Sequence, residues 1–206
     1  MKWTEFAVRE ARQTLIEWEQ RYDKLEPPIP VEDIADLLYS LAIDITDDLP
    51  SGTAGRLYVE DRIIAARKSD ANVRQRFTIA HEIGHYRLHV VAEGLLTTDH
   101  TCSGDSIGDL VITEHSFLVE LESSDPNIAH NSTIVNPKRL EIEANRFAAE
   151  VLMPATLIEA TVAYRGADIT SLAELFDVSF QAMRFRLEKL LFLPPSGPQS
   201  SLLIDL

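Results

Sequence analysis

Three residues, His81, Glu82 and His85, have the types and spacing of a metal-dependent hydrolytic site. On an α-helix, side chains four positions apart lie on the same face, so both imidazoles can reach one ion. Imidazole nitrogens suit Zn²⁺, which binds them at about 2.0–2.1 Å. Glu82 could serve as a general base toward a water molecule. The motif therefore indicates a Zn²⁺ site, with Mn²⁺ as an alternative ion; two helical histidines without a metal are the competing interpretation.

The motif must lie on a helix for this chemistry to work, and the flanking sequence favours one. Residues 71–90 contain no proline, and the preceding Ser69 and Asp70 are residue types that cap helix N-termini. Apolar residues recur at steps of three and four, which predicts one buried stripe bordered by both histidines. Gly84 costs about 1 kcal/mol relative to alanine in a helix, a cost that close approach of another backbone would explain.

A catalytic zinc site needs a third protein ligand. His89 lies about 12 Å from His81 along a continuous helix, at 1.5 Å per residue, so one ion cannot bridge that pair. We therefore expect His89 to be packed near the site rather than bound to the ion. Glu141 and Glu143 are better candidates because they flank an apolar helical stripe, and their positions relative to it favour Glu143 weakly. The alternative for either carboxylate is a solvated helix surface.

Composition and charge narrow the class of protein. The chain has 206 residues, 45% apolar and 25% charged, which is typical of one globular domain or one domain with a small appendage. A net charge of −14 disfavours general affinity for nucleic acid or an anionic membrane. The single cysteine excludes an internal disulfide framework, the charged N-terminus does not resemble a signal peptide, and no apolar run approaches a membrane span. We expect a cytoplasmic protein.

The elements that must position the site predict an α+β fold, mainly helical with a small β-sheet. Apolar spacing, proline and turn residues place these elements along the chain. We expect helices over 3–25, 31–41, 71–90, 137–153 and 154–164, a strand over 42–46, and a hairpin or one longer strand over 57–66. Residues 97–135 read as a partly ordered insertion, with polar loop chemistry over 97–106 and β-like alternation over 109–121.

Residues 172–187 have the rhythm of two short helices joined by a tight turn, as in a helix-turn-helix, and Ser171 and Glu174 have capping-box spacing. This pattern raises a DNA-binding protein as the competing class. Residues 168–206, however, carry three basic against five acidic side chains, which is poor for a phosphate-binding surface. We expect this segment to pack on the preceding domain or to recognise a protein partner, so direct nucleic-acid binding is not expected.

Two longer blocks, Arg76–His89 and Glu141–Pro154, resemble the ImmA/IrrE family of metallopeptidases, and the resemblance covers roughly residues 29–190. It implies a zincin-like metallopeptidase domain over 1–166, containing the insertion at about 97–135, followed by a helix-turn-helix-like segment and tail over 167–206. It also implies that the glutamate before Ala-Asn, Glu143, is the third zinc ligand. Members of the family cleave helix-turn-helix repressors that control phage, mobile-element or stress genes.

The resulting prediction is a zinc-dependent endopeptidase in which His81, His85 and Glu143 bind the ion and Glu82 is the catalytic base. The expected partner is a helix-turn-helix repressor, and no membrane partner is expected. The alternative is a non-catalytic protein-binding or DNA-binding regulator, antitoxin-like, with a degenerate site. The strand region 57–66 could pair with an extended substrate by edge addition. Candidates for stabilising an oxyanion are left open: His115, His130, Arg146 and Tyr164.

Cys102 allows two interpretations. With His100 and Asp105 nearby, its thiolate could cap the zinc until it is oxidised or displaced. An exposed loop cysteine without a role is the simpler interpretation.

Overall fold

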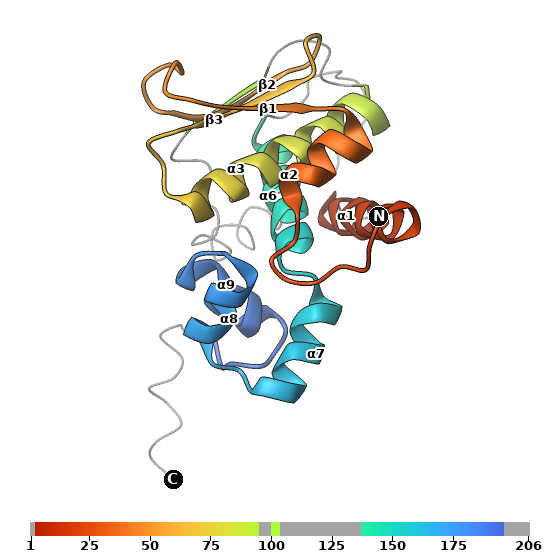
Figure 1. The fold of residues 1–206 in the computed structure, drawn as a ribbon, viewed down its shortest axis with the longest axis vertical. Helices are drawn as coiled ribbons and strands as arrows, with labels where there is room; N and C mark the ends of the chain where they lie inside the picture. The colour runs from red at the N-terminus through yellow and green to blue at the C-terminus, as the bar shows by residue number, and fades with distance from the viewer. Residues whose placement is uncertain (1–2, 95–99, 104–136, 196–206) are drawn as a thin grey trace, which may run out of the picture.

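A computed structural model of the chain describes residues 3–94, 100–103 and 137–195, and every structural statement here concerns those residues. A four-stranded sheet lies over helix α3, and helix α6 runs from this region toward the three C-terminal helices α7, α8 and α9 (Figure 1). The fold is therefore α+β, mainly helical with one small sheet, as the sequence predicts.

The sheet has the strand order β1-β3-β2-β4, with β1 parallel to β3 and the other two pairs antiparallel. Its strands are β1 (Ala42–Thr46), β2 (Thr53–Tyr58), β3 (Ile63–Arg67) and β4 (His100–Ser103). The first strand lies where it is predicted, and the region over 57–66 forms a hairpin. The polar loop predicted over 97–106 is wrong for β4, because these residues pair with β2. Cross-strand pairing is a tertiary contact that local composition does not reveal.

Strand order also corrects the expected mode of substrate binding. The two strands of the β2–β3 hairpin each have a neighbour on both sides within the described sheet, so neither presents a free edge. Edge addition at 57–66 is therefore wrong. The described edges of the sheet are β1 and β4.

The histidine motif lies on α3 (Asn72–Gly84), which continues without a break into η2 (His85–Ala92), where the turns widen to π-helical geometry. The helix predicted over 71–90 is thus confirmed. Its predicted caps are wrong, because the residue before the first turn is Ala71 and no side chain caps that end. π-Helical turns inside α-helices occur frequently at functional sites.

Helix α6 (Pro137–Leu152) crosses the metal-motif helix at Gly84. A Cβ atom at this glycine would lie 3.1 Å from the Ala144 Cα and 3.2 Å from both the Ala144 oxygen and the Phe147 Cδ1 atom. The predicted reason for this glycine, close approach of another backbone, is confirmed. The predicted apolar face of α6 is also buried in the core: Leu140, Ala144, Phe147 and Val151.

The remaining N-terminal helices cover this pair. They are α1 (Trp3–Arg21), α2 (Val31–Asp33) and the short π-helical segment η1 (Ile34–Leu38). Buried apolar residues of α1, including Ala7 and Leu15, belong to the same hydrophobic core as Ile79 and Phe147. The core therefore surrounds the helices that carry the site residues.

The C-terminal helices are α7 (Ala155–Arg165), α8 (Ile169–Phe176) and α9 (Phe180–Lys189). Phe176 and Leu187 belong to the main core, so this segment packs on the rest of the chain as expected. The N-cap of α8 is Asp168, whose Oδ1 accepts from the Ser171 N–H at 2.8 Å. The predicted capping box, which placed Ser171 at the cap, is wrong because the helix begins one turn earlier.

The length and composition of a helix decide whether it could span a membrane. In the described ranges, no single helix is long and apolar enough to cross a bilayer, although α6 and α7 together, bent by 42° at the break between them, have the length and composition to do so.

Candidate metal centre

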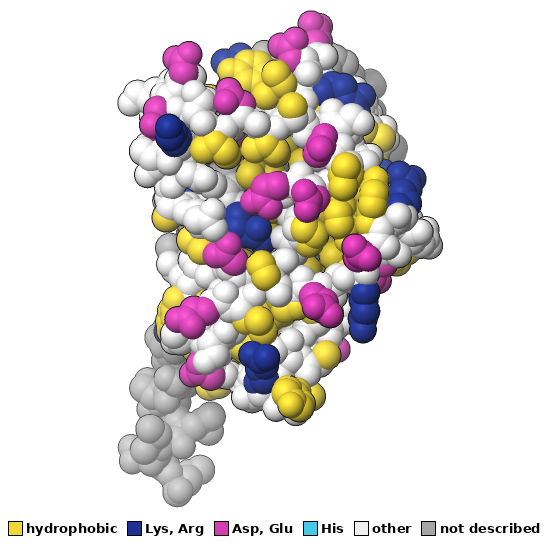
Figure 2. Space-filling view, in the orientation of Figure 1, with side chains coloured by type: hydrophobic (Ala, Val, Ile, Leu, Met, Phe, Trp, Pro, Cys, Tyr) yellow, Lys and Arg dark blue, Asp and Glu magenta, His cyan; other side chains and the backbone are white. Residues whose placement is uncertain are grey.

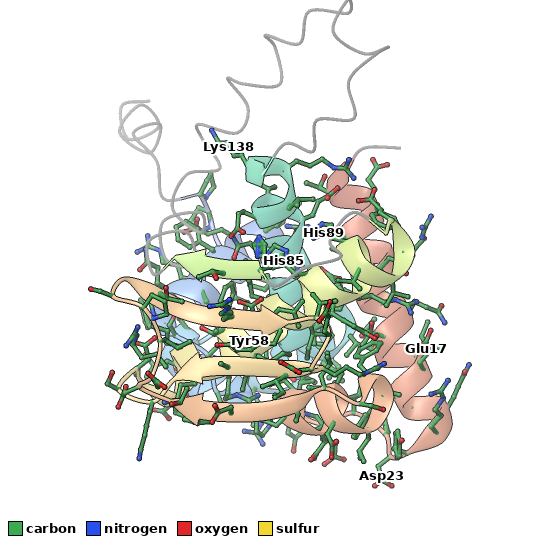
Figure 3. The ribbon with its side chains drawn as sticks, turned by 90° about the horizontal axis from the view of Figure 1, so that it is seen from above. Glu17, Asp23, Tyr58, His85, His89 and Lys138 are labelled. Atoms are coloured by element: carbon green, nitrogen blue, oxygen red, sulfur yellow. The ribbon has the colours of Figure 1, made fainter. Side chains whose placement is uncertain are left out.

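The two motif histidines turn their Nε2 atoms toward each other. His81 and His85 are fully buried, and their Nε2 atoms lie 3.0 Å apart. Figure 3 shows His85 and the neighbouring His89 between α6 and the continuation of α3. This arrangement confirms that the motif places both imidazoles on one helical face. Two ring nitrogens at this distance share either a proton or a cation.

Glu141 of α6 completes the cluster. Its Oε1 lies 3.3 Å from the His85 Nε2 atom, and its Oε2 lies 3.4 Å from the His81 Nε2 atom. All these donor atoms, together with the Cys102 sulfur, lie within 4.8 Å of one another. The structure therefore brings Glu141, not Glu143, to the two histidines.

Glu143 contacts His89 instead of His81 and His85. This contact corrects the prediction that its carboxylate joins the two motif histidines. Its Oε2 is 3.1 Å from the His89 Nε2 atom, and its Oε1 accepts from the Arg139 Nε–H at 3.1 Å. Residues two apart on a helix point about 200° apart around its axis, so Glu141 reaches His81 and His85 while Glu143 reaches His89, farther along the same continuous helix. His89 is packed beside the site, as predicted, and is not among the four clustered donors.

Hydrogen bonds on the far side of each ring leave both Nε2 lone pairs facing the cluster. The His81 Nδ1–H donates to the Asn145 Oδ1 at 3.0 Å. The His89 Nε2–H donates to Glu143, so the His89 Nδ1 atom accepts, and the His85 Nδ1–H donates to it at 3.0 Å. We assign these protons from the contacts, because only this arrangement satisfies each neutral ring. Such partners fix the tautomer and orientation of metal-binding histidines.

The donor set fits Zn²⁺. Nitrogen and oxygen ligands at about 2.0–2.1 Å in tetrahedral geometry place donor atoms roughly 3.3 Å from one another. The separations among His81, His85 and Glu141 are 3.0, 3.3 and 3.4 Å. Two imidazoles and one carboxylate are also the kind of ligand set found in catalytic zinc sites.

The electrostatics of the cluster keep the carboxylate charged and one ring neutral. Burial lowers the pKa of His85 well below its usual range. Burial acts the same way on His81, but the hydrogen bond to Glu141 and the charge of Glu82 outweigh it and raise the pKa of that ring. Burial alone would raise the pKa of Glu141, but the adjacent imidazoles of His81 and His85 hold it well below its usual range.

Glu82 is fully buried beside this cluster. Neither of its oxygens has a hydrogen-bond partner of ordinary geometry among the described residues. Strand β2 packs directly against it, because a Cβ at Gly55 would lie 2.8 Å from its Oε1 and 2.3 Å from the Thr78 Cγ2 atom. Burial raises the pKa of Glu82 to about 7. A carboxyl group in this state can both accept and return a proton near neutral pH.

Two residues from β4 border the site. The Cys102 side chain is 1% exposed, so the simpler interpretation of an exposed loop cysteine is wrong. The His100 Nε2 atom lies 3.5 Å from the Glu141 Oε1 atom. The sequence suggests a role for this pair only because His100 and Asp105 lie near Cys102 along the chain. The strand pairing that places them there is not visible in the sequence.

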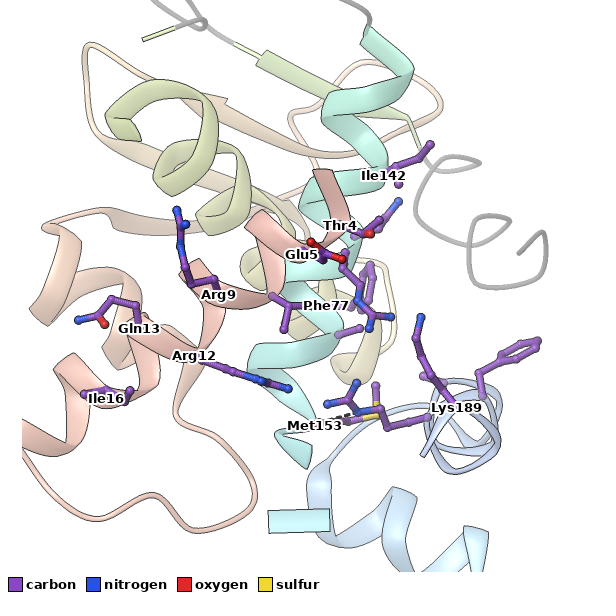
Figure 4. A pocket seen from close by; sticks show the side chains of 17 residues that line it. Thr4, Glu5, Arg9, Arg12, Gln13, Ile16, Phe77, Ile142, Met153 and Lys189 are labelled. Carbon is purple, nitrogen blue, oxygen red and sulfur yellow. Dashed lines mark hydrogen bonds between the residues drawn. The ribbon is translucent and has the colours of Figure 1, made fainter. Parts of the chain in front are cut away.

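Of the four candidates for oxyanion stabilisation, the two that the structure describes do not lie in the donor cluster. Tyr164 on α7 is 88% exposed and lies outside the donor cluster. Arg146 lines a cavity of about 750 Å³ between α1, α6 and α9 (Figure 4). None of the clustered donors lines that cavity, but Asn145 and Phe77 border both the cavity and His81. His115 and His130 lie outside the described residues.

The sequence model of the IrrE N-terminal-like domain, a peptidase family, matches residues 40–106 and 117–188. The chain belongs to the ImmA/IrrE metallopeptidase family. Its match spans both the histidine helix and α6, so it includes each of the clustered donors. Among curated proteins, no relative matches the chain.

A solved structure supports the fold. A Mycobacterium tuberculosis transcriptional regulator is similar with a TM-score of 0.53 and 17% sequence identity, over 87% of this chain. The chain spans 46% of that protein's length. At this identity, the likeness concerns the fold.

Proposed function

We propose that the protein is a zinc-dependent endopeptidase that cleaves a helix-turn-helix transcriptional repressor and so derepresses phage, mobile-element or stress genes. One observation supports peptidase chemistry most directly: two buried imidazoles and the Glu141 carboxylate converge, with buried Glu82 beside them. Family membership points to the same chemistry. The proposal of a repressor as the substrate is based on the resemblance to the family. The proposal of a cytoplasmic setting without a membrane partner is based on the sequence.

The roles of the residues follow from their placement. Held by His81, His85 and Glu141, a zinc ion would supply a Lewis acid for the scissile carbonyl and lower the pKa of a water molecule. Glu82 then takes the proton of the attacking water on a carboxylate oxygen and delivers it to the leaving amine. Its burial against Gly55 holds the carboxylate in place for both transfers.

The alternative, a non-catalytic protein-binding or DNA-binding regulator, has weaker support. Arg186, one of three basic side chains in the 168–206 segment, is 5% exposed and ion-paired with Glu150 at 2.8 Å. On the face drawn in Figure 2, basic side chains are interspersed with acidic and apolar ones rather than gathered in one band. Both observations argue against a phosphate-binding surface at the helix-turn-helix-like segment.

The first prediction concerns the general base. We expect the wild-type protein to cleave the repressor encoded beside its gene, and a chelator to abolish cleavage. Glu82→Gln should bind zinc equally but lose about 10²- to 10⁴-fold in cleavage rate, because the amide cannot accept the water proton. Gel analysis of the repressor and elemental analysis of zinc measure the two properties.

Glu174→Gln is the matched control, since this carboxylate is exposed on α8. It should retain both zinc and cleavage. Cleavage by Glu82→Gln at the wild-type rate would remove Glu82 as the base. A wild-type protein without stoichiometric zinc would favour the non-catalytic alternative.

A further inference from the structure

Cys102 points its sulfur into the donor cluster. Its Sγ lies 3.1 Å from the His81 Nε2 atom, 3.6 Å from the His100 Nδ1 atom and 3.9 Å from the Glu141 Oε1 atom. It is the single cysteine of the chain. The side chain packs beside Ala54 and Phe77, and its sulfur is placed as a fourth donor.

The surroundings of this sulfur are polar and buried. His81 and His85 offer Nε2 lone pairs to the same point, and the carboxylate of Glu82 is fully buried without an ordinary hydrogen-bond partner among the described residues. Unpaired buried polar atoms are costly, and within this cluster both Glu82 oxygens and the Glu141 Oε2 atom lack a hydrogen-bond partner of ordinary geometry among the described residues. A cation that binds nitrogen, oxygen and sulfur would provide a partner within the cluster.

The distances agree with this donor set. Zinc binds thiolate sulfur at about 2.3 Å and imidazole nitrogen at about 2.0–2.1 Å, which separates such donors by roughly 3.6 Å in tetrahedral geometry. The Cys102 sulfur lies 3.1 Å from the His81 Nε2 atom and 3.9 Å from Glu141. These values lie on either side of the expected separation.

We infer that Cys102 is a fourth protein ligand that closes the metal site of the free protein. The inference rests on the proposed function, since it requires an ion at His81, His85 and Glu141. On binding, the thiol gives its proton to solvent and a sulfur–metal bond replaces the S–H bond. Zinc sites with four protein ligands are closed, whereas catalytic ones keep one position open. The closed form is therefore inactive until the sulfur leaves.

Strand β4, which carries Cys102, is held less firmly than the elements that carry the other donors. The other three donors lie on α3, η2 and α6, which are packed in the core. Strand β4 has four residues, lies at the edge of the sheet, and pairs with β2 alone among the described strands. Withdrawing β4 breaks one strand ladder and leaves the histidines and Glu141 in place. The sulfur can therefore leave the ion without displacing the other three donors.

Spectroscopy tests the ligand directly. The full-length protein is freed of metal and titrated with Co²⁺ alone, and the zinc-loaded protein is measured by X-ray absorption. We expect one ion per chain, a thiolate-to-cobalt charge-transfer band in the near ultraviolet, and a sulfur neighbour of zinc at about 2.3 Å. Cys102→Ser and Cys102→Ala should retain the ion and lose the band and the sulfur neighbour. Thr101→Ala, a change at an exposed residue of the same strand, should retain both signals.

The outcomes separate the two proposals. One bound ion without a sulfur signal in the wild-type protein overturns the Cys102 inference and leaves the proposed metal site intact. Metal binding that is equal in the wild-type protein and in a His81→Ala variant overturns the site itself. The wild-type X-ray absorption result decides the question even where a cysteine variant fails to fold.

The rate of repressor cleavage tests whether the thiolate closes the site. With the repressor as substrate, Cys102→Ala should cleave at least tenfold faster than the wild-type protein before any activation, because the fourth position is open from the start. Equal rates, with the sulfur signal present in the wild-type protein, would show that the thiolate binds the ion without closing the site. That result would overturn the regulatory part of the inference.

Discussion

At the scale of single residues, a series of hydrogen-bonded side chains holds the His85 ring on the side opposite the metal site. The His85 Nδ1 atom contacts the His89 Nδ1 atom, and His89 in turn donates to Glu143, whose other oxygen accepts from Arg139. This arrangement gives Glu143 a different role from the one predicted: it orients a ligand. The sequence places both residues near the site but does not distinguish ligand from support.

The second prediction tests this support. His89→Phe keeps an aromatic ring in the buried position but removes the acceptor for the His85 N–H. Zinc affinity should fall about 10- to 100-fold, because the tautomer of His85 is no longer fixed. Competition with a metal-binding dye measures the affinity. Leu88→Met, a volume-conserving change at the adjacent buried position, is the control and should leave the affinity within about twofold. An unchanged affinity in His89→Phe would contradict the supporting role.

The sequence predicts part of the site because local spacing decides that part. His81, Glu82 and His85 follow from an i, i+4 motif on one helix, which requires no knowledge of the rest of the fold. Choosing between Glu141 and Glu143 requires the crossing geometry of two helices, which is a tertiary property. A usable signal is present in hindsight, since Glu141 and Asn145 are four apart and both face the motif histidines.

At the scale of elements, the contact between the motif helix and α6 depends on Gly84. The third prediction is that Gly84→Ala destabilises the protein by about 1 kcal/mol or more, despite the higher helix propensity of alanine. The added methyl would meet the backbone of Ala144, which cannot rotate away. Urea denaturation measures the loss. Combining it with Phe147→Leu should not restore stability, because the backbone contacts remain; full recovery would show that the ring alone opposes the methyl.

The capped end of α8 gives a pH-dependent prediction. The hydrogen bonds from Ser171 lower the pKa of Asp168 below its ordinary value. A carboxyl whose pKa is lower in the folded state stabilises the protein above its unfolded pKa of about 3.9, and this contribution is lost as the pH falls through the folded value. Asp168→Asn should therefore be less stable than the wild-type protein at pH 6, with the difference shrinking toward pH 3. Paired denaturation curves at both values measure it, and a constant difference would contradict the ionic contribution.

The helices and strands β1 and β3 could be predicted because each has its own periodicity or turn residues, whereas β2 begins at Thr53, before the predicted start at residue 57. Strand β4 could not, since its four residues have polar loop composition and become a strand only by pairing with β2. The predicted pairing of a substrate with the hairpin was wrong because strand order, a tertiary property, decides which edges of the sheet are free. The β-like alternation over 109–121 lies outside the described residues.

At the scale of the whole molecule, one buried carboxylate joins three helices. Glu150 of α6 is 2.8 Å from the Arg186 Nη2 atom on α9 and 3.1 Å from the Arg12 Nε atom on α1. The Arg186 Nε–H also donates to the Met153 carbonyl oxygen at 2.8 Å. The C-terminal helices are therefore attached to the core by buried charge as well as by apolar contacts.

The fifth prediction measures this attachment. Glu150→Gln should destabilise the protein by about 3 kcal/mol, because the buried guanidinium of Arg186 loses its countercharge. Thermal and chemical denaturation measure the change. Glu159→Gln is the matched control: this carboxylate is exposed on α7, so the change should stay within about 0.5 kcal/mol. Equal effects of the two variants would contradict a special role for Glu150.

The positions of Cys102 and Glu141 have a consequence for chain length. They are 39 residues apart in sequence, yet the sulfur of one and a carboxylate oxygen of the other lie 3.9 Å apart. The intervening stretch therefore starts and finishes at nearly the same point in space. Closing a loop costs only about 0.6 kcal/mol more for each doubling of its length. A change in the number of residues between the two donors should therefore cost little in stability and leave their separation unchanged.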